Sequence, residues 1–152
     1  NDNSTGQIVL SGMNKDLDAL TEDLKKNTIK NIRLPVSAPF HSKLMSSATE
    51  IMKQEINQSN FIHPKNTIIS NVTSLETTEP NQIKELLIKQ IENPVRWRES
   101  VIYMINKGVT KFVEIGPGKV LSGLVKRIDR SVTIVSINEL DDLQGVKLND
   151  WF

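Results

Sequence analysis

The sequence has 152 residues, of which 38% are hydrophobic and 24% charged, a composition typical of a globular domain and not of a disordered chain. Nineteen basic residues face eighteen acidic ones, and the resulting formal charge of +1 gives no general attraction to nucleic acid or to an anionic membrane. The chain has no cysteine and two histidines, which excludes a disulfide scaffold, a thiolate nucleophile and a cysteine zinc site and argues against a bound metal.

Apolar residues at regular spacing divide the chain into alternating elements. Short aliphatic runs bounded by Gly, Pro or Asn predict strands, whereas apolar positions three and four residues apart predict helices. No apolar run approaches the roughly 20 residues of a membrane span. Strands that alternate with helices predict an α/β fold, followed by an acidic tail in which we expect Trp151 and Phe152 to dock. The expected strands are 7–11, 29–36, 67–72, 111–115 and 131–137, and the expected helices are 15–26 with Asn14 as cap, 43–57, 81–91, 93–107 with Gly108 as C-cap, and 119–128.

His41 has the clearest chemical potential. It follows a predicted strand and a proline and stands at the entry to a predicted helix, and functional loops of open α/β folds lie beyond the carboxyl ends of strands. Because imidazole exchanges protons near neutral pH, a histidine there is suited to act as a general base. The plainer interpretation, which the local sequence alone favours, is a histidine that hydrogen-bonds its own loop. For His63, before Pro64, we expect a surface or packing role.

Three other segments have ordinary structural interpretations beside functional ones. Gly116-Pro117-Gly118-Lys119 opens a helix and resembles a phosphate-binding turn, but the P-loop pattern is incomplete, and a tight turn is favoured. Lys126-Arg127 lies at the end of a predicted helix, where basic side chains complement the helix dipole. This interpretation is favoured over a docking site for an acidic partner. Asn1 and Asn3 either orient polar groups near a site or form a turn before a strand. The serine nucleophile pattern G-x-S-x-G does not occur in the sequence.

Five segments resemble, in the same order, the C-terminal half of malonyl-CoA:acyl carrier protein transacylases. Each motif is weak by itself, whereas five in order across nearly the whole chain are specific. They are NxNSxGQIVxxG at 1–12, LPVSAPFHS at 34–42, SNV at 70–72, QIENPVRW at 90–97, and GV at 108–109 followed by ExGPGKVLxGLxKR at 114–127.

The resemblance implies a role for each matched position. His41 would be the catalytic base that activates a serine, which takes malonyl from coenzyme A and passes it to the phosphopantetheine thiol of acyl carrier protein. The main-chain carbonyl of Gln90 would hold the other imidazole nitrogen and fix the tautomer. Phe40 would help to select the acyl group, because a bulky ring leaves no space for an α-methyl group. Asn1 and Asn3 would lie near the mouth of the cleft as substrate-binding residues, and Lys126 and Arg127 would contact the acidic carrier protein and raise its on-rate.

The resemblance also implies a fold and a limit. Residues 1–36 would be the last part of a ferredoxin-like small subdomain, and residues 37–152 part of an α/β-hydrolase-like parallel-sheet core. The family's serine in GHSxGE, its GQG segment and its substrate arginine have no counterpart here. We therefore expect a piece of a longer enzyme that is inactive alone and leaves apolar sheet edges open.

The resemblance leaves several alternatives and expectations. A non-catalytic remnant that binds carrier protein or coenzyme A is the alternative function, and an acyltransferase domain of a polyketide synthase with another extender unit is a third. We expect no metal or cofactor apart from coenzyme A and phosphopantetheine as substrate moieties, and no nucleic-acid or membrane partner. For the full-length protein we expect a monomer in the bacterial cytoplasm, with an organelle as second choice.

Overall fold

The computed structural model describes residues 1–145, which form two compact units. The first comprises Asn1 and Val9–Val95, and the second comprises Asp2–Ile8 and the residues from Arg96 onward. Trp151 and Phe152, which we expected to dock, lie outside the described residues. The boundary that we expected near residue 36 stays a prediction.

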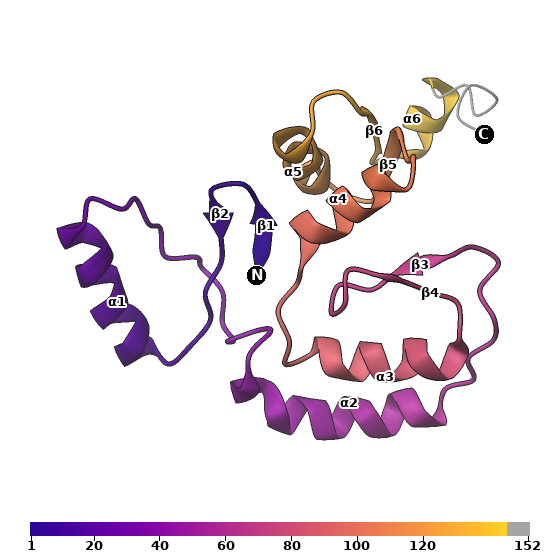
Figure 1. The fold of residues 1–152 in the computed structure, drawn as a ribbon. Helices are drawn as coiled ribbons and strands as arrows, with labels where there is room; N and C mark the ends of the chain where they lie inside the picture. Colours follow the sequence, from indigo (N-terminus) through magenta and orange to yellow (C-terminus); the bar gives the residue numbers. More distant parts are fainter. Residues whose placement is uncertain (146–152) are drawn as a thin grey trace. The chain divides into compact units, whose positions relative to one another are not determined.

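The second unit contains the parallel strand pair on which the α/β expectation rests. β5 (Lys111–Ile115) pairs in parallel with β6 (Thr133–Ile137), in a register that runs from Lys111 opposite Thr133 to Ile115 opposite Ile137. The helix α5 (Val120–Ile128) connects them, as a parallel pair requires. The strands, α4 (Trp97–Asn106) and the short α6 (Leu140–Gly145) appear in orange to yellow in Figure 1. The mixed α/β class is therefore present.

One apolar cluster holds the second unit together. Val101 is fully buried between the elements, and Val125 and Val132 are nearly so. Burying each such side chain stabilises the fold by about 1.5–3 kcal/mol. Along β5, by contrast, Val113 and Ile115 alternate outward and stay exposed, so one face of this strand is apolar and open among the described residues. The residues packed against the cluster are Trp97, Met104, Ile105, Phe112, Ile128 and Ile134.

A small hairpin also belongs to the second unit. β1 (Asp2–Ser4) and β2 (Gln7–Ile8) pair antiparallel across a turn at Gly6, whose φ of +73° lies in the left-handed region that glycine adopts freely. The strand expected over 7–11 is therefore shorter than predicted. Its partner, β1, lies in a segment that the sequence analysis interpreted as a turn.

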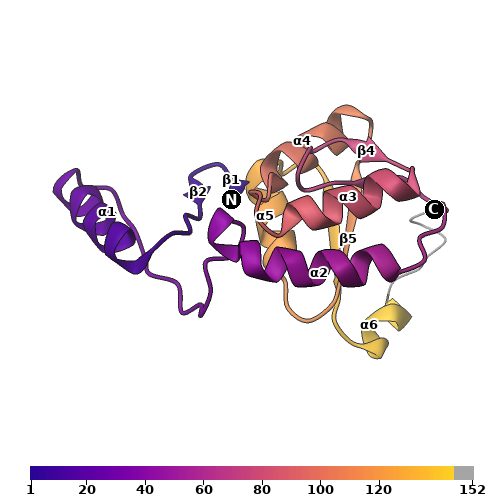
Figure 2. The same cartoon turned by 90° about the horizontal axis from the view of Figure 1, so that it is seen from below.

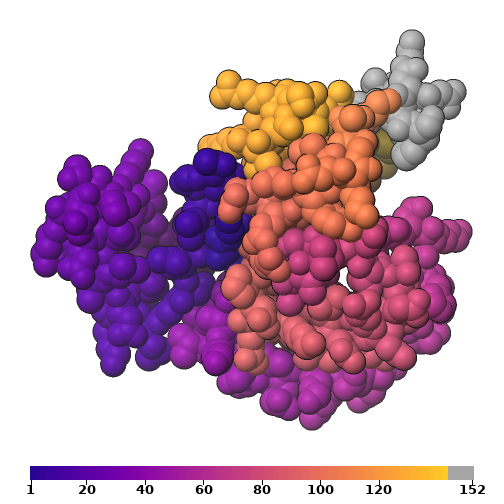
Figure 3. All heavy atoms as spheres, viewed as in Figure 1, coloured from indigo at the N-terminus to yellow at the C-terminus, as the bar shows by residue number. Residues whose placement is uncertain are grey.

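The first unit is built mainly from helices. α2 (Ser46–Gln58) follows the 3-10 turn η1 (Lys43–Met45), and α3 (Pro80–Gln90) packs along it, antiparallel and side by side in Figures 1 and 2. In the space-filling view the atoms of these two helices meet along their length (Figure 3). An antiparallel pair of short strands, β3 (Ile68–Ile69) and β4 (Glu76–Thr77), precedes α3. The remaining helix, α1 (Asn14–Lys26), buries none of its residues.

The structure corrects several expected elements. Residues 29–36 form no strand, because none of the described residues pairs with them, and Ile32 is 75% exposed. The strand expected over 67–72 shrinks to β3, and β4 lies in a segment for which no strand was expected. The helix expected from residue 93 begins only at Trp97, where Arg96 is the cap residue with a non-helical backbone. Asn14 does not cap α1: the cap position is Met13, and the Asn14 oxygen accepts from Arg33 instead.

No helix among residues 1–145 combines the length and the apolarity that crossing a membrane requires.

Candidate active site

His41 lies in a tight loop that its neighbours fix. The Ser42 hydroxyl donates to the Pro39 carbonyl over 2.7 Å and accepts from the Leu44 N–H over 3.3 Å, so Ser42 caps η1 directly after the histidine. His41 itself has a φ of +60°, a conformation that costs a non-glycine residue on the order of 1–3 kcal/mol. Backbone strain of this kind concentrates at functional sites, where the surrounding structure maintains it.

The imidazole of His41 reaches the end of α3. Its Nδ1 lies 2.9 Å from the main-chain oxygen of Gln90. Because a carbonyl oxygen only accepts, Nδ1 must carry the hydrogen, and in the neutral ring Nε2 then keeps its lone pair. The arrangement therefore presents Nε2 as a proton acceptor, which is the state that a general base requires.

The Gln90 side chain has a different partner. Its Nε2 donates to the Asn93 carbonyl over 3.0 Å and lies 3.4 Å from the His41 Nδ1. Two donors cannot bond to each other, so the shorter contact to the Gln90 oxygen decides the tautomer. The expected pairing of atoms is present, whereas the catalytic role of His41 and the orienting role of Gln90 stay predictions.

Of the three other residues expected at the substrate cleft, Asn1 has a clear main-chain partner. Its Oδ1 accepts from the Val95 N–H over 2.8 Å, and its carbonyl accepts from the Val9 N–H over 2.9 Å. Asn3 is half-buried in β1, and the Phe40 side chain, beside His41, is 49% exposed. A substrate role for these residues stays a prediction.

The pair expected to dock carrier protein divides between two environments. Lys126 lines a surface hollow of about 380 Å³ that also includes Lys119, Ser122 and Ser136. The Arg127 guanidinium instead donates to the Gln7 side-chain oxygen, at the hairpin of the same unit. Lys126 is therefore placed in a basic hollow, while Arg127 has an internal contact.

The glycine-rich turn before α5 is organised by a carboxylate. Glu114 accepts from the main-chain N–H groups of Leu121 and Ser122 over 2.9 and 2.7 Å, and hydrogen bonds from Ser122, followed by that from Leu121, lower the pKa of its carboxyl. Gly116 and Gly118 both have positive φ in this turn. Because the Glu114 carboxylate already takes these two amides, the favoured interpretation as a strand-to-helix turn fits the geometry better than a phosphate site.

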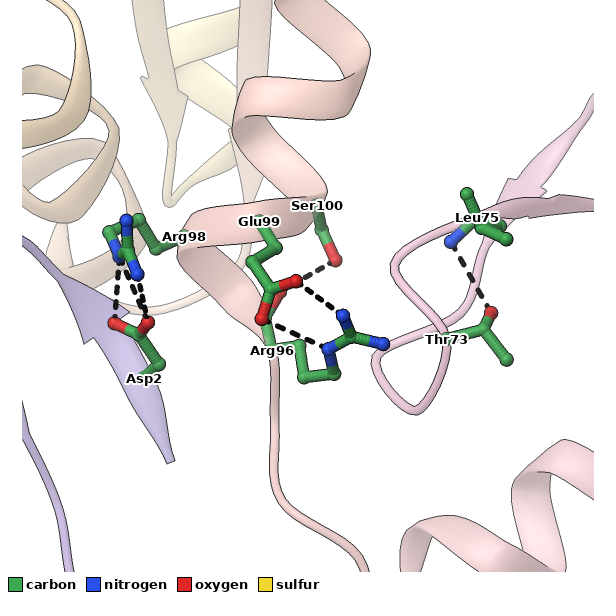
Figure 4. A network of polar contacts seen from close by, with 7 residues as sticks. All are labelled: Asp2, Thr73, Leu75, Arg96, Arg98, Glu99 and Ser100. Atoms are coloured by element: carbon green, nitrogen blue, oxygen red, sulfur yellow. Dashed lines mark hydrogen bonds and ion pairs between the residues drawn. The ribbon is translucent and has the colours of Figure 1, made fainter.

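Two arginines at the start of α4, in the second unit, hold ion pairs. Arg98 contacts Asp2 through two nitrogens, with the shortest distance 2.6 Å, and this hydrogen bond lowers the pKa of the Asp2 carboxyl despite partial burial (Figure 4). The hydrogen bond from Arg96 likewise lowers the pKa of Glu99. The Arg98–Asp2 pair links β1 to α4, whereas the Arg96–Glu99 pair lies within the start of α4. In residues 1–145, no group of three or more His, Asp or Glu side chains gathers as a metal site would require.

The sequence analysis missed Ser42 and Asn93. Both act through hydrogen bonds between a side chain and the main chain. The signal for Ser42 was a serine before a helix, which is a common cap, and the signal for Asn93 was an asparagine after the last helical turn.

Taken together, the fold and the site define a mixed α/β chain in which a histidine ring is hydrogen-bonded to a main-chain carbonyl. Residues 2–141 match the acyl transferase domain family, and the chain belongs to that family.

Several known proteins resemble the chain. It is 43% identical, over 143 residues, to the malonyl CoA-acyl carrier protein transacylase of Bacillus subtilis, an alignment that covers 93% of this chain and 45% of that protein. The crystal structure of the malonyl CoA-acyl carrier protein transacylase of Clostridium perfringens matches with a TM-score of 0.81 and 36% identity, over 89% of this chain and 42% of that one. A structure of a type II PKS acyl-carrier protein in complex with its malonyl-transacylase matches with a TM-score of 0.84 and 30% identity, over 91% and 45%. The chain thus spans about half the length of the relatives that it matches.

Proposed function

We propose that this chain supplies the catalytic base of an enzyme that transfers malonyl from coenzyme A to acyl carrier protein for fatty-acid synthesis. The observation that carries the proposal is the bond from the His41 Nδ1 to the Gln90 oxygen, because it leaves Nε2 free to take a proton. The names of the relatives support malonyl as the acyl group and a carrier protein as the partner.

The proposed reaction has two half-reactions with the same base. A serine hydroxyl gives its proton to the His41 Nε2 and attacks the malonyl thioester carbonyl, and coenzyme A leaves as a thiol after taking that proton. The phosphopantetheine thiol then gives its proton to Nε2 and attacks the carbonyl of the serine ester. The bond from that carbonyl to the serine oxygen breaks, and the oxygen takes the proton back from Nε2 to regenerate the serine hydroxyl. The chemistry needs a nucleophile and a base, so we propose no resident cofactor or metal.

These 152 residues do not contain the GHSxGE motif that carries the family's nucleophilic serine. We therefore propose that the chain alone does not catalyse malonyl transfer. We further propose Phe40 as a contributor to acyl selectivity, Asn1 and Asn3 as residues near the substrate, and Lys126 with Arg127 as a carrier-protein contact. We propose that residues 1–36 belong to a ferredoxin-like small subdomain and residues 37–152 to an α/β-hydrolase-like core. We propose further that the full-length protein is a monomer in the cytoplasm.

A chimaera tests the function directly. The N-terminal part of the Bacillus subtilis relative, joined to this chain, would supply the serine, and malonyl transfer to carrier protein would be measured. We expect His41→Ala to lower kcat/KM by roughly 10²–10⁴-fold, and the matched substitution His63→Ala to leave it unchanged. Full transfer by the His41→Ala chimaera would contradict the proposal.

Mass spectrometry separates the proposal from the alternative of a non-catalytic remnant. After incubation with malonyl-CoA, we expect a malonyl adduct on the serine of the chimaera and none on the 152-residue chain. A folded chimaera that binds carrier protein or coenzyme A but forms no adduct would favour the remnant.

A further inference from the structure

The Gln90 carbonyl lies at a helix end where main-chain donors normally compete for it. The last four carbonyl groups of a helix lack helical partners and are readily taken by N–H groups that follow in the chain. For Gln90 the following candidates are residues 93, 94 and 95, at spacings of three, four and five. What happens to these three N–H groups determines whether the carbonyl stays free for His41.

Asn93 directs its own donors to the preceding carbonyl. Its main-chain N–H and its side-chain Nδ2 both donate to the Lys89 oxygen, over 3.1 and 2.7 Å. Its carbonyl in turn accepts from the Gln90 Nε2 over 3.0 Å, which holds the Gln90 amide in the same turn. The Lys89 oxygen thus takes the donors that a looser turn would offer to Gln90.

The next two residues also withhold their donors. Pro94, at the spacing of a regular helical bond, has no N–H at all. The Val95 N–H is bonded to the Asn1 Oδ1 over 2.8 Å. Among the described residues, His41 is the donor recorded for the Gln90 oxygen.

We propose that Asn93 and Pro94 are positioning residues for His41: they keep the Gln90 carbonyl free of main-chain donors, so that it accepts from the imidazole and fixes the tautomer. Asn1 assists by holding the Val95 N–H. The catalytic meaning of this arrangement rests on the proposed function, whereas the arrangement itself is measurable without any turnover.

The tautomer of His41 is the readout, because a purely structural role for Asn93 or Pro94 would not change it. Nitrogen-15 NMR of the histidine rings, in the 152-residue chain at a pH where both rings are neutral, reports which nitrogen carries the hydrogen. His63, for which no side-chain hydrogen bond is recorded within residues 1–145, is the internal reference in the same sample. We expect His41 to favour the Nδ1–H form far more than His63 does.

The variants have matched controls elsewhere in the first unit. Asn93→Ala removes the side-chain hydrogen bond to the Lys89 oxygen and leaves the main-chain one. Pro94→Ala supplies the main-chain N–H that proline lacks. The control for the first is Asn27→Ala, because the Asn27 Nδ2 makes the same contact to the Asp23 oxygen, over 2.8 Å, at the end of α1. The control for the second is Pro80→Ala, at the first position of α3, where an N–H has no helical partner.

We expect each of the two variants to lower the ratio of the Nδ1–H to the Nε2–H form of His41 by roughly two- to tenfold, the effect of weakening one hydrogen bond. The two controls should leave the ratio unchanged. An unchanged ratio in Asn93→Ala and Pro94→Ala would overturn the proposal, as would an equal change in all four variants or a wild-type His41 that matches His63. Loss of malonyl transfer by the chimaera with an intact tautomer would instead count against the proposed function alone.

Discussion

The elements from α4 to β6 and the helix α1 are both amphipathic in sequence, yet only the first set is packed. Val101, Val125 and Val132 are buried together in the first region, whereas α1 has no buried residue although Leu17, Leu20 and Leu24 form a stripe on it. Helical pattern therefore decides that an element forms, and long-range partners decide whether it contributes a core.

The two helices also differ in how each begins and ends. α4 ends at Asn106, and two residues later the Gly108 N–H donates to the Ile105 carbonyl, while the Val109 N–H donates to the Met104 carbonyl. α1 ends with the same pair of bonds, but Thr28 stands at the glycine position with a φ of +60°. A β-branched residue in that conformation is strained. Optimal capping thus accompanies the packed region and not the exposed one.

The largest effect should come from a charge placed in the packed cluster. Val125 is 3% exposed, so Val125→Asp would bury a carboxylate without a partner and lower the free energy of unfolding by more than about 3 kcal/mol. Leu24→Asp on α1 should change it by less than about 1 kcal/mol. Urea unfolding followed by circular dichroism measures both variants. If Val125→Asp does not fold, Val125→Ala replaces it, with an expected loss of about 2 kcal/mol in the free energy of unfolding. Equal effects at the two sites would refute the distinction between the regions.

The helix ends provide the next test. Gly108→Ala forces a side chain into the left-handed region and should lower the free energy of unfolding by about 1–2 kcal/mol. Thr28→Gly removes the same strain and should raise it by up to about 1 kcal/mol, reduced by the greater freedom of glycine in the unfolded chain. The two variants are compared by their urea midpoints. A loss of stability in Thr28→Gly would mean that the threonine side chain makes a contact worth more than its strain.

How far the sequence anticipates these features depends on the range of the interaction. α3, β5 and α5 were predicted to within one or two residues at each end, because periodicity and punctuation by Gly and Pro act locally. The strand expected over 29–36 is wrong because a strand exists only when it is paired, and β-propensity does not reveal the partner. The hairpin at β1 was missed because its pairing depends on Gly6 in a segment that also reads as a turn.

The candidate site divides in the same way. The resemblance to the transacylase family implied that His41 meets the Gln90 carbonyl, although 49 positions separate them. Periodicity alone gave no reason to join them. Ser42 and Asn93 were missed because serine and asparagine caps are so common that a single sequence does not mark the functional ones. The contact of Arg127 with Gln7 spans 120 positions, and no local pattern predicts it.

Capping at the other helix ends should have a smaller effect. Glu114→Ala removes the acceptor for two N–H groups at the start of α5 and should lower the free energy of unfolding by about 1 kcal/mol, while Glu114→Gln, which keeps an acceptor, should lose less. Met13→Asp would give α1 the cap that it lacks and raise the free energy by about 0.5–1 kcal/mol. Thermal unfolding of the three variants checks this, and a Glu114→Gln variant as unstable as Glu114→Ala would point to charge instead of capping.

The smallest expected effect is the acid sensitivity of the second unit. Among residues 1–145, the carboxyls whose pKa is lowered all lie in that unit, and hydrogen bonds are the largest cause for each of them, Asp2 and Glu99 included. A carboxyl with a lowered pKa in the folded state contributes stability that is present above its pKa in the unfolded chain and is lost as the pH falls through the folded value. Stability should therefore decline on the acid side of about pH 4.

Asp2→Asn separates one member of that group. It should make the stability curve flatter in acid and lower the plateau slightly, because the Arg98 and Asp2 side chains are 38% and 28% exposed and solvent screens their attraction. The matched control is Asp18→Asn, because Asp18 forms an exposed ion pair from α1 to Arg33. This variant should leave the stability curve unchanged. Urea midpoints measured across the acid range decide between them. If Asp2→Asn and Asp18→Asn flatten the curve equally, the acid response belongs to the surface charge of the whole chain and not to the contacts that join β1 to α4.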